Sequence, residues 1–64
     1  MTNFHKNIKH YRQSKDLSQK QFAKLLNISD TAISGWENNK HEPSLDKLIE
    51  IAELLDVTYE DLLL

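Results

Sequence analysis

Residues 19–38 read QKQFAKLLNISDTAISGWEN, and this stretch predicts two short helices joined by a tight turn. Ala23 lies midway along the first helix, where only a small side chain lets a second helix come close. Asn27 tolerates the left-handed backbone that ends a helix, and Ser29 offers its hydroxyl as the N-cap of the next one. The two helices are therefore expected to pack at a fixed angle.

Ile33 and Trp36 stand three residues apart in the second of these helices. Residues at that spacing lie on one side of a helix, so both side chains are expected to face the first helix. We interpret Trp36 as a core residue in preference to a ring that stacks on a ligand, because an apolar helical stripe normally becomes buried. The opposite side of this helix is expected to face solvent.

The rest of the chain predicts an all-α fold of one domain, residues 1–64. It contains one glycine and one proline, and no long stretch alternates apolar and polar residues as a strand does. Helical periodicity and N-capping residues predict five helices, at about residues 3–15, 19–26, 30–38, from 45 onward, and after Thr58. The core residues expected from the second and fourth helices are Phe22, Ala23, Leu25, Leu26, Leu45, Leu48, Ile49, Ile51, Ala52 and Leu55.

Charge is divided unevenly along the chain, although the net charge of −2 is small. Residues 1–41 carry seven basic and three acidic side chains, a balance of +4, and residues 42–64 carry one basic and seven acidic ones, a balance of −6. The first part can attract phosphate while the second part repels it.

Several classes of protein do not fit this sequence. The chain has no cysteine and no apolar run long enough to cross a membrane, so we expect a cytoplasmic protein without a membrane partner. His5, His10 and His41 are too scattered for a metal site, and we expect no cofactor. No glycine-rich phosphate loop or enclosed pair of catalytic carboxylates is present, so we do not expect an enzyme.

Three stretches together resemble a known family, and they read LSQKQFAKLLNIS (17–29), AISGWENNK (32–40) and PSLDKLIEIAELLDVTYEDLL (43–63). Nearly end to end they are similar to the compact five-helix DNA-binding domain of lambda-repressor-like (XRE-type) transcriptional regulators. The resemblance implies a helix-turn-helix formed by the second and third helices, with the third in the major groove of double-stranded operator DNA. It also implies a prokaryotic or phage regulator, with repression as the expected direction.

The same resemblance implies which residues touch DNA. The positions that match base-reading residues of the family are Asp30, Thr31, Ser34 and Gly35, and those that match phosphate-binding residues are Gln19, Asn38, Asn39 and Lys40. A phosphate beside Gln19 would also meet the free N–H groups of a helix N-terminus. Gly35 stands where many relatives carry Arg, Lys or Gln, so specificity is expected to depend partly on close backbone approach or DNA shape.

Arg12 and Glu37 match positions that form an ion pair in some relatives. We expect a partly buried pair that ties the first helix to the end of the third, and the alternative is two separate surface charges.

The C-terminal part is expected to mediate self-association. Leu54 is expected on the side of the fourth helix that faces away from the core, and Leu62, Leu63 and Leu64 cannot all face inward from one short helix. We expect these four leucines in the interface of a weak homodimer, and the alternative is that the chain is the DNA-binding part of a longer regulator. An alternative function is an antitoxin-like or adapter module whose acidic half binds another protein, with weak DNA binding or none. Salt separates the two hypotheses, because binding to phosphates weakens steeply as salt rises.

Overall fold

The computed structural model describes residues 3–64, so Met1 and Thr2 of the expected domain lie outside the described range. Within it the chain forms helices and no strand, which confirms the expected all-α fold. The helices are α1 (Phe4–Ser14), α2 (Gln19–Leu26), α3 (Asp30–Glu37), α4 (Leu45–Leu55) and α5 (Tyr59–Leu63).

Among residues 3–64, the side-chain hydroxyl of a Ser or Thr caps the N-terminus of four of the five helices. Ser18, Ser29, Ser44 and Thr58 have extended backbone, and each hydroxyl accepts a hydrogen bond from the backbone N–H three residues later. At Ser18 the cap is a complete capping box, because the Gln21 side chain also accepts from the Ser18 N–H at 2.8 Å. These bonds satisfy N–H groups that have no partner inside the helix, so the sequence sets where each helix begins.

Short polar residues end the helices or begin the loops that follow them. Asp16, Asn27, Asn39 and Asp56 all have left-handed backbone, with φ between 56° and 58°. At Asn27 this conformation lets the next N–H, that of Ile28, donate to the Ala23 carbonyl at 3.0 Å. The chain therefore makes its sharp turns with Asn and Asp, which tolerate this conformation better than other side chains do.

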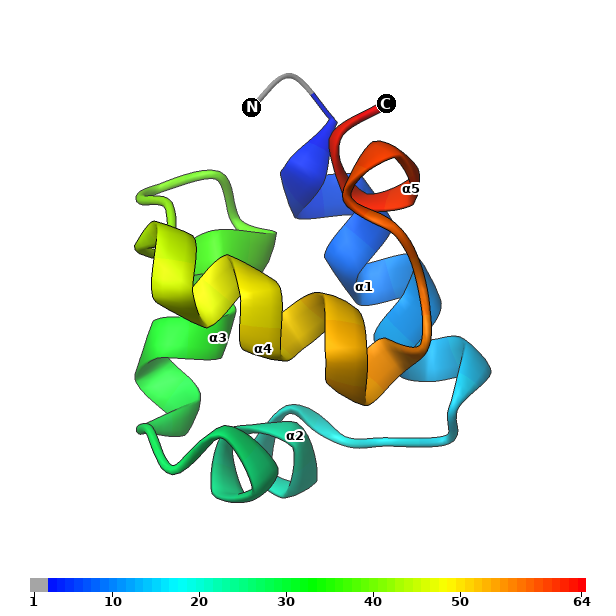
Figure 1. The fold of residues 1–64 in the computed structure, drawn as a ribbon. Coiled ribbons are helices and arrows are strands. Elements are labelled where there is room, and N and C mark those ends of the chain that lie inside the picture. The colour runs from blue at the N-terminus through cyan, green and yellow to red at the C-terminus, as the bar shows by residue number, and fades with distance from the viewer. Residues whose placement is uncertain (1–2) are drawn as a thin grey trace.

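The helices surround a single core. α1 packs against α3 and α5, α2 packs against α3 and α4, and α4 also contacts α5. Figure 1 shows α1 and α5 side by side, with the first described residues and the C-terminus at the same end. The buried apolar residues are Phe4, Ile8, Phe22, Ala23, Leu26, Ile33, Trp36, Leu48, Ile51, Ala52, Leu55 and Leu62.

Two leucines that the sequence places in the core are exposed instead. Leu25 is 56% exposed, because the buried stripe of α2 consists of Phe22, Ala23 and Leu26 and leaves Leu25 at its edge. Leu45 is the first residue of α4 and is 70% exposed, so the packed stripe of that helix begins one turn later, at Leu48. Both predictions were wrong, because helical periodicity does not show where the neighbouring helices stop.

Candidate nucleic-acid interface

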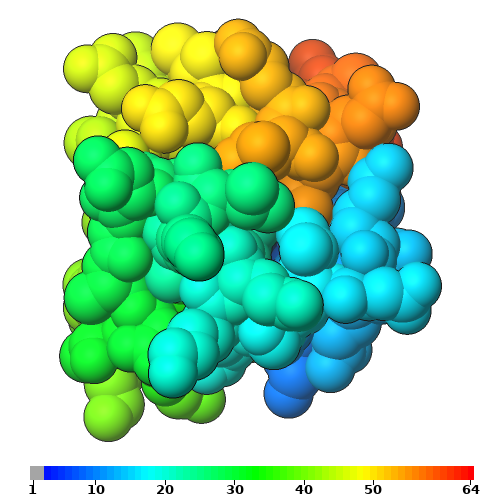
Figure 2. Space-filling view, turned by 90° about the horizontal axis from the view of Figure 1, so that it is seen from below, coloured from blue at the N-terminus to red at the C-terminus, as the bar shows by residue number. Residues whose placement is uncertain are grey.

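The packing of α2 against α3 fixes which side of α3 faces solvent. Ile33 is fully buried and Trp36 is 5% exposed, so the two residues expected to face inward do so. Ala23 is buried in α2, the partner of α3, as expected for a small residue at a close approach. Figure 2 shows the outer surface of α2 in the middle of the view, with α3 along one side and α4 along another.

The exposed surface of α3 carries three of the four residues expected to read bases. Asp30 and Thr31 are exposed in its first turn, and Ser34 is half-buried one turn later. The Ser34 hydroxyl accepts a hydrogen bond from the Asn38 side-chain amide at 3.1 Å. Short polar side chains therefore line the part of α3 that a groove of DNA could meet.

The fourth expected base-contacting residue, Gly35, is not open to solvent. It is buried, because the imidazole of His41 lies over it. A Cβ atom on Gly35 would come within 2.7 Å of both Cδ2 and Cε1 of His41, closer than real side chains allow. The prediction that Gly35 itself contacts a base is wrong for this conformation, and so is the expected close approach of DNA to bare backbone at this point.

In the sequence, His41 was considered only as a possible metal ligand, so its contact with Gly35 was not predicted. A signal was present, since a glycine inside a helix is unfavourable and needs a reason. Here the reason is space for a ring that arrives from the following loop. The loop is short enough that His41, six residues after Gly35, was a candidate for that ring.

The end of α3 turns sharply and brings the loop back beside the helix. Asn39 takes the left-handed conformation, the Asn39 N–H donates to the Trp36 carbonyl at 3.2 Å, and the Lys40 N–H donates to the Gly35 carbonyl at 2.9 Å. Asn38, Asn39 and Lys40 are all exposed. The three loop residues expected to bind phosphate are thus held at one end of the α3 surface, at the left of Figure 1.

Gln19, the fourth expected phosphate-binding residue, begins α2 and is half-buried. Its side-chain amide donates to Glu37 Oε1 at 3.0 Å. Glu37 in turn pairs with Arg12 through a bond of 2.6 Å from Arg12 Nε and one of 3.1 Å from Arg12 Nη2. The expected pair of Arg12 and Glu37 is confirmed, and it orients Gln19 as well.

Some lysines are free to meet a ligand at the surface, whereas one lysine makes a hydrogen bond within the domain. Lys20, Lys24 and Lys40 are exposed around α2 and the end of α3. Lys47, the only basic residue after residue 41, has a structural role, because its Nζ donates to the Leu26 carbonyl at the end of α2 at 2.9 Å. A cation there satisfies a free carbonyl at a helix C-terminus.

The four leucines expected in a dimer interface are not equivalent. Leu62 is fully buried against the chain's own core, Leu63 is partly buried beside it, and Leu54 and Leu64 are 38% and 82% exposed. The assignment of Leu62 to an interface is therefore wrong. α5 docks on α1 and turns Leu62 inward, and the Leu62 carbonyl accepts from the Asn7 side chain at 2.9 Å.

Two further features bear on the expected function classes. Among residues 3–64, no three potential ligands of the types His, Asp and Glu come close enough to hold a metal ion. No helix in that range has both the length and the apolar character that crossing a membrane requires.

A family model described as helix-turn-helix matches residues 8–62 of the chain. Among similar curated proteins, the chain is 38% identical over 60 residues to the HTH-type transcriptional activator BcrR of Enterococcus faecalis and 35% identical over 57 residues to the antitoxin PezA of Streptococcus pneumoniae. These alignments cover 94% and 89% of the chain but only 29% and 36% of the two relatives. The chain thus spans about a third of the length of either protein.

Two other alignments cover most of the matched protein as well as most of this chain. An uncharacterized HTH-type transcriptional regulator of Methanocaldococcus jannaschii is 36% identical over 55 residues, which are 86% of this chain and 83% of that protein. The crystal structure of the restriction-modification controller protein C.AhdI from Aeromonas hydrophila superimposes with a TM-score of 0.84 and 27% identity. That match covers 94% of this chain and 87% of the other.

Proposed function

Because this chain belongs to the lambda-repressor-like (XRE-type) helix-turn-helix family of transcriptional regulators, we propose that it binds double-stranded operator DNA sequence-specifically, with α3 in the major groove. The observation that carries the proposal is the outward surface of α3. Ile33 and Trp36 hold the opposite side of this helix in the core, so Thr31 and Ser34 point away from the domain. Hydroxyl groups of this kind can hydrogen-bond base edges in the major groove.

Phosphate-binding groups gather beside the C-terminal end of that surface. The N-terminus of α2 offers backbone N–H groups, and the Gln19 side chain there is oriented by Glu37, the last residue of α3. Asn38, Asn39 and Lys40 directly follow Glu37 and are exposed in the turn after α3. Contacts of this type set the position of a domain on the duplex, whereas Thr31, Ser34 and Asp30 would choose the sequence.

Charge supports the same orientation. The exposed lysines of α2 and of the loop after α3 lie in the part of the chain with a balance of +4, and the acidic residues concentrate in and around α4 and α5. DNA that approaches α3 meets the basic part first. The small negative net charge therefore does not argue against DNA binding, because phosphate interacts mainly with charges within about 10 Å.

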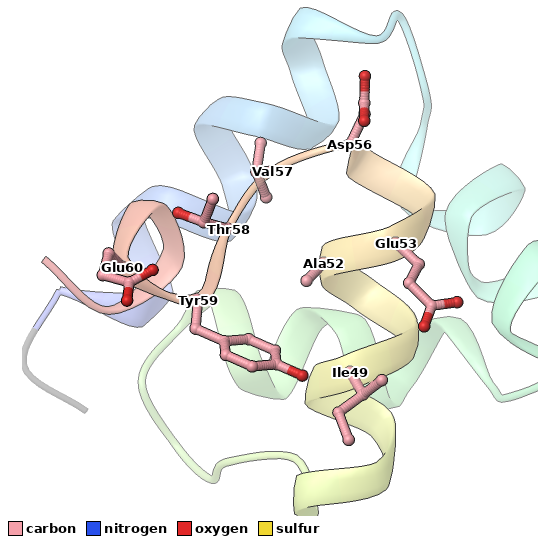
Figure 3. A pocket seen from close by; sticks show the side chains of 8 residues that line it. All are labelled: Ile49, Ala52, Glu53, Asp56, Val57, Thr58, Tyr59 and Glu60. Carbon is pink, nitrogen blue, oxygen red and sulfur yellow. The ribbon is translucent and has the colours of Figure 1, made fainter.

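We keep the homodimer in the proposal, but its interface no longer includes the buried Leu62. We propose a weak homodimer formed through the C-terminal part of the chain, with Leu54, Leu63 and Leu64 as contributors. Tyr59 is 44% exposed, and its aromatic ring reaches across a shallow hollow toward Ile49 of α4, as Figure 3 shows. A two-fold contact of this kind would place two copies of α3 about 34 Å apart, one turn of DNA.

The direction of regulation depends on where the operator lies relative to a promoter. We still expect repression, although one relative is named as a transcriptional activator. We also propose a location in the cytoplasm of a prokaryotic cell, which the bacterial and archaeal sources of the relatives support. The antitoxin-like alternative, in which the acidic half binds a protein partner, has one specific support, the similarity to an antitoxin.

Selection from a pool of double-stranded oligonucleotides with a randomised centre tests the proposal. We expect an enriched motif, and we expect its affinity to fall at least tenfold between about 50 mM and about 200 mM salt. Fluorescence anisotropy with the enriched duplex measures both properties. Failure to enrich any motif, or an affinity for the pool that is independent of salt, would overturn DNA recognition and favour the protein-binding alternative.

A further inference from the structure

We propose that His41 is a base-reading residue of this domain and replaces the side chain that Gly35 lacks. The inference deepens the proposed function and depends on it. It starts from the position of Gly35, which lies one helical turn after Thr31 and on the same side of α3. A side chain at position 35 would therefore extend the base-reading surface by one turn.

The ring of His41 occupies that place. Its Nε2, Cδ2 and Cε1 are the three atoms nearest to the point where a Cβ of residue 35 would stand, and Nε2 is the closest of them. The Nε2 edge of the ring thus packs against Gly35, and Nδ1 lies on the opposite edge of the ring. The His41 residue nevertheless remains exposed, so the ring is not sealed in the core.

The turn after α3 holds His41 in this position. Asn39 reverses the chain direction with φ of 58°, and the Lys40 N–H closes the turn on the Gly35 carbonyl at 2.9 Å. His41 is the next residue, so its backbone starts beside the helix and its ring needs to span only a short gap. Gly35 and His41 therefore form a unit, because any larger residue at position 35 must displace the ring.

The chemistry of imidazole suits the major groove. A neutral imidazole presents one N–H donor and one acceptor nitrogen, and guanine presents two acceptors, N7 and O6, on its major-groove edge. Donation from the Nδ1–H of His41, on the ring edge away from Gly35, to a guanine would specify one base pair in each half-site. The neighbouring Thr31 and Ser34 would read other base pairs with shorter side chains.

The test compares four proteins on the same pool of randomised double-stranded oligonucleotides: wild type, His41→Ala, Gly35→Ala and the double variant. His41→Ala should bind the best wild-type duplex about tenfold more weakly and lose the preference at one base pair per half-site, while its melting temperature stays near that of wild type. Gly35→Ala should lose the same preference, because the new Cβ displaces the ring.

The double variant shows whether Gly35 and His41 act on DNA binding together or independently. Its affinity should equal that of His41→Ala, and it should melt at a higher temperature than His41→Ala, because alanine favours a helix more than glycine does once the ring is gone. His10→Ala is the matched control, since His10 is an exposed histidine of α1 between the buried residues Ile8 and Arg12 and points away from the core. This control should keep both the motif and the affinity.

Two results would overturn the assignment while the proposed function stands. If His41→Ala selects the wild-type motif with wild-type affinity, His41 reads nothing. If it weakens binding to every sequence equally, His41 contacts phosphate and not a base. A wild-type protein that enriches no motif at low salt would instead overturn the proposed function together with this inference.

Discussion

Arg12 and Glu37 form a two-pronged ion pair in which both side chains are nearly buried, with 8% and 3% of their surfaces exposed. The pair joins α1 to the last residue of α3. Arg12 also donates from Nη1 to the Leu17 carbonyl at 2.6 Å, and Glu37 also accepts from Gln19. One pair of charges therefore ties together α1, the loop before α2, the start of α2 and the end of α3, which are the elements that frame the proposed DNA surface.

Removal of one partner from this pair is expected to be costly. Arg12→Ala or Glu37→Ala should each lower the free energy of unfolding by about 3–5 kcal/mol, because the remaining charge stays buried without its counterion. The matched control is Arg12→Met combined with Glu37→Leu, which should lose much less than the sum of the two single changes. Urea unfolding measures all three variants. Single losses below about 1 kcal/mol would be typical of an exposed pair and would contradict the buried one.

Thr31→Ala and Ser34→Ala should weaken binding to the best operator by about 1–3 kcal/mol and relax its base preference. Thr31 is exposed, so its change should leave the melting temperature nearly unchanged. Ser34 also accepts a hydrogen bond from Asn38, so a small loss of stability is expected there. A large fall in melting temperature for Thr31→Ala with unchanged DNA affinity would mean that the wrong side of α3 has been assigned to DNA.

Gln19→Ala and Lys40→Ala should weaken binding to specific and random duplexes alike, because these residues are proposed to touch phosphate. The slope of log affinity against log salt should become shallower by about 1 for Lys40→Ala, which removes a cation, and should not change for Gln19→Ala. Titrations at several salt concentrations measure both slopes. An effect confined to one base pair of the operator would contradict the assignment.

Asn27→Ala should lower the free energy of unfolding by about 1 kcal/mol, because alanine pays a larger penalty for the left-handed conformation that this residue adopts. Asn27→Gly should cost little or nothing, since glycine takes this conformation readily. Lys24→Ala, at an exposed position of the same helix, is the control for a surface change. Equal stability of the alanine and glycine variants would show that the turn does not need this backbone conformation in solution.

Leu54→Glu and Leu64→Glu should abolish the proposed homodimer while the domain stays folded, because both residues are exposed in the monomer. Leu62→Glu is unsuitable as a test, since its fully buried side chain would unfold the core. Sedimentation with and without a palindromic operator measures the association. A wild-type protein that stays monomeric and fills the two half-sites independently would remove the dimer from the proposal.

Local rules made much of this domain predictable. The N-caps at Ser18, Ser29, Ser44 and Thr58 and the left-handed turn at Asn27 depend on atoms no more than four residues away, so they can be deduced from sequence. The inward direction of Ile33 and Trp36 follows from helical periodicity in the same way. These features were sufficient to orient α3, and the family resemblance then identified Asp30 and Thr31, which the structure leaves exposed.

Contacts between distant parts of the chain decided the rest. Leu62 is buried because α5 docks on α1, where the Asn7 side chain meets the carbonyl of Leu62 across 55 residues of sequence. Leu25 and Leu45 stay exposed because the neighbouring helices do not cover them. Gly35 lost its expected role for a similar reason, since the ring that covers it comes from the next loop. Periodicity states which residues share one side of a helix, but only tertiary packing decides how much of that side another segment covers.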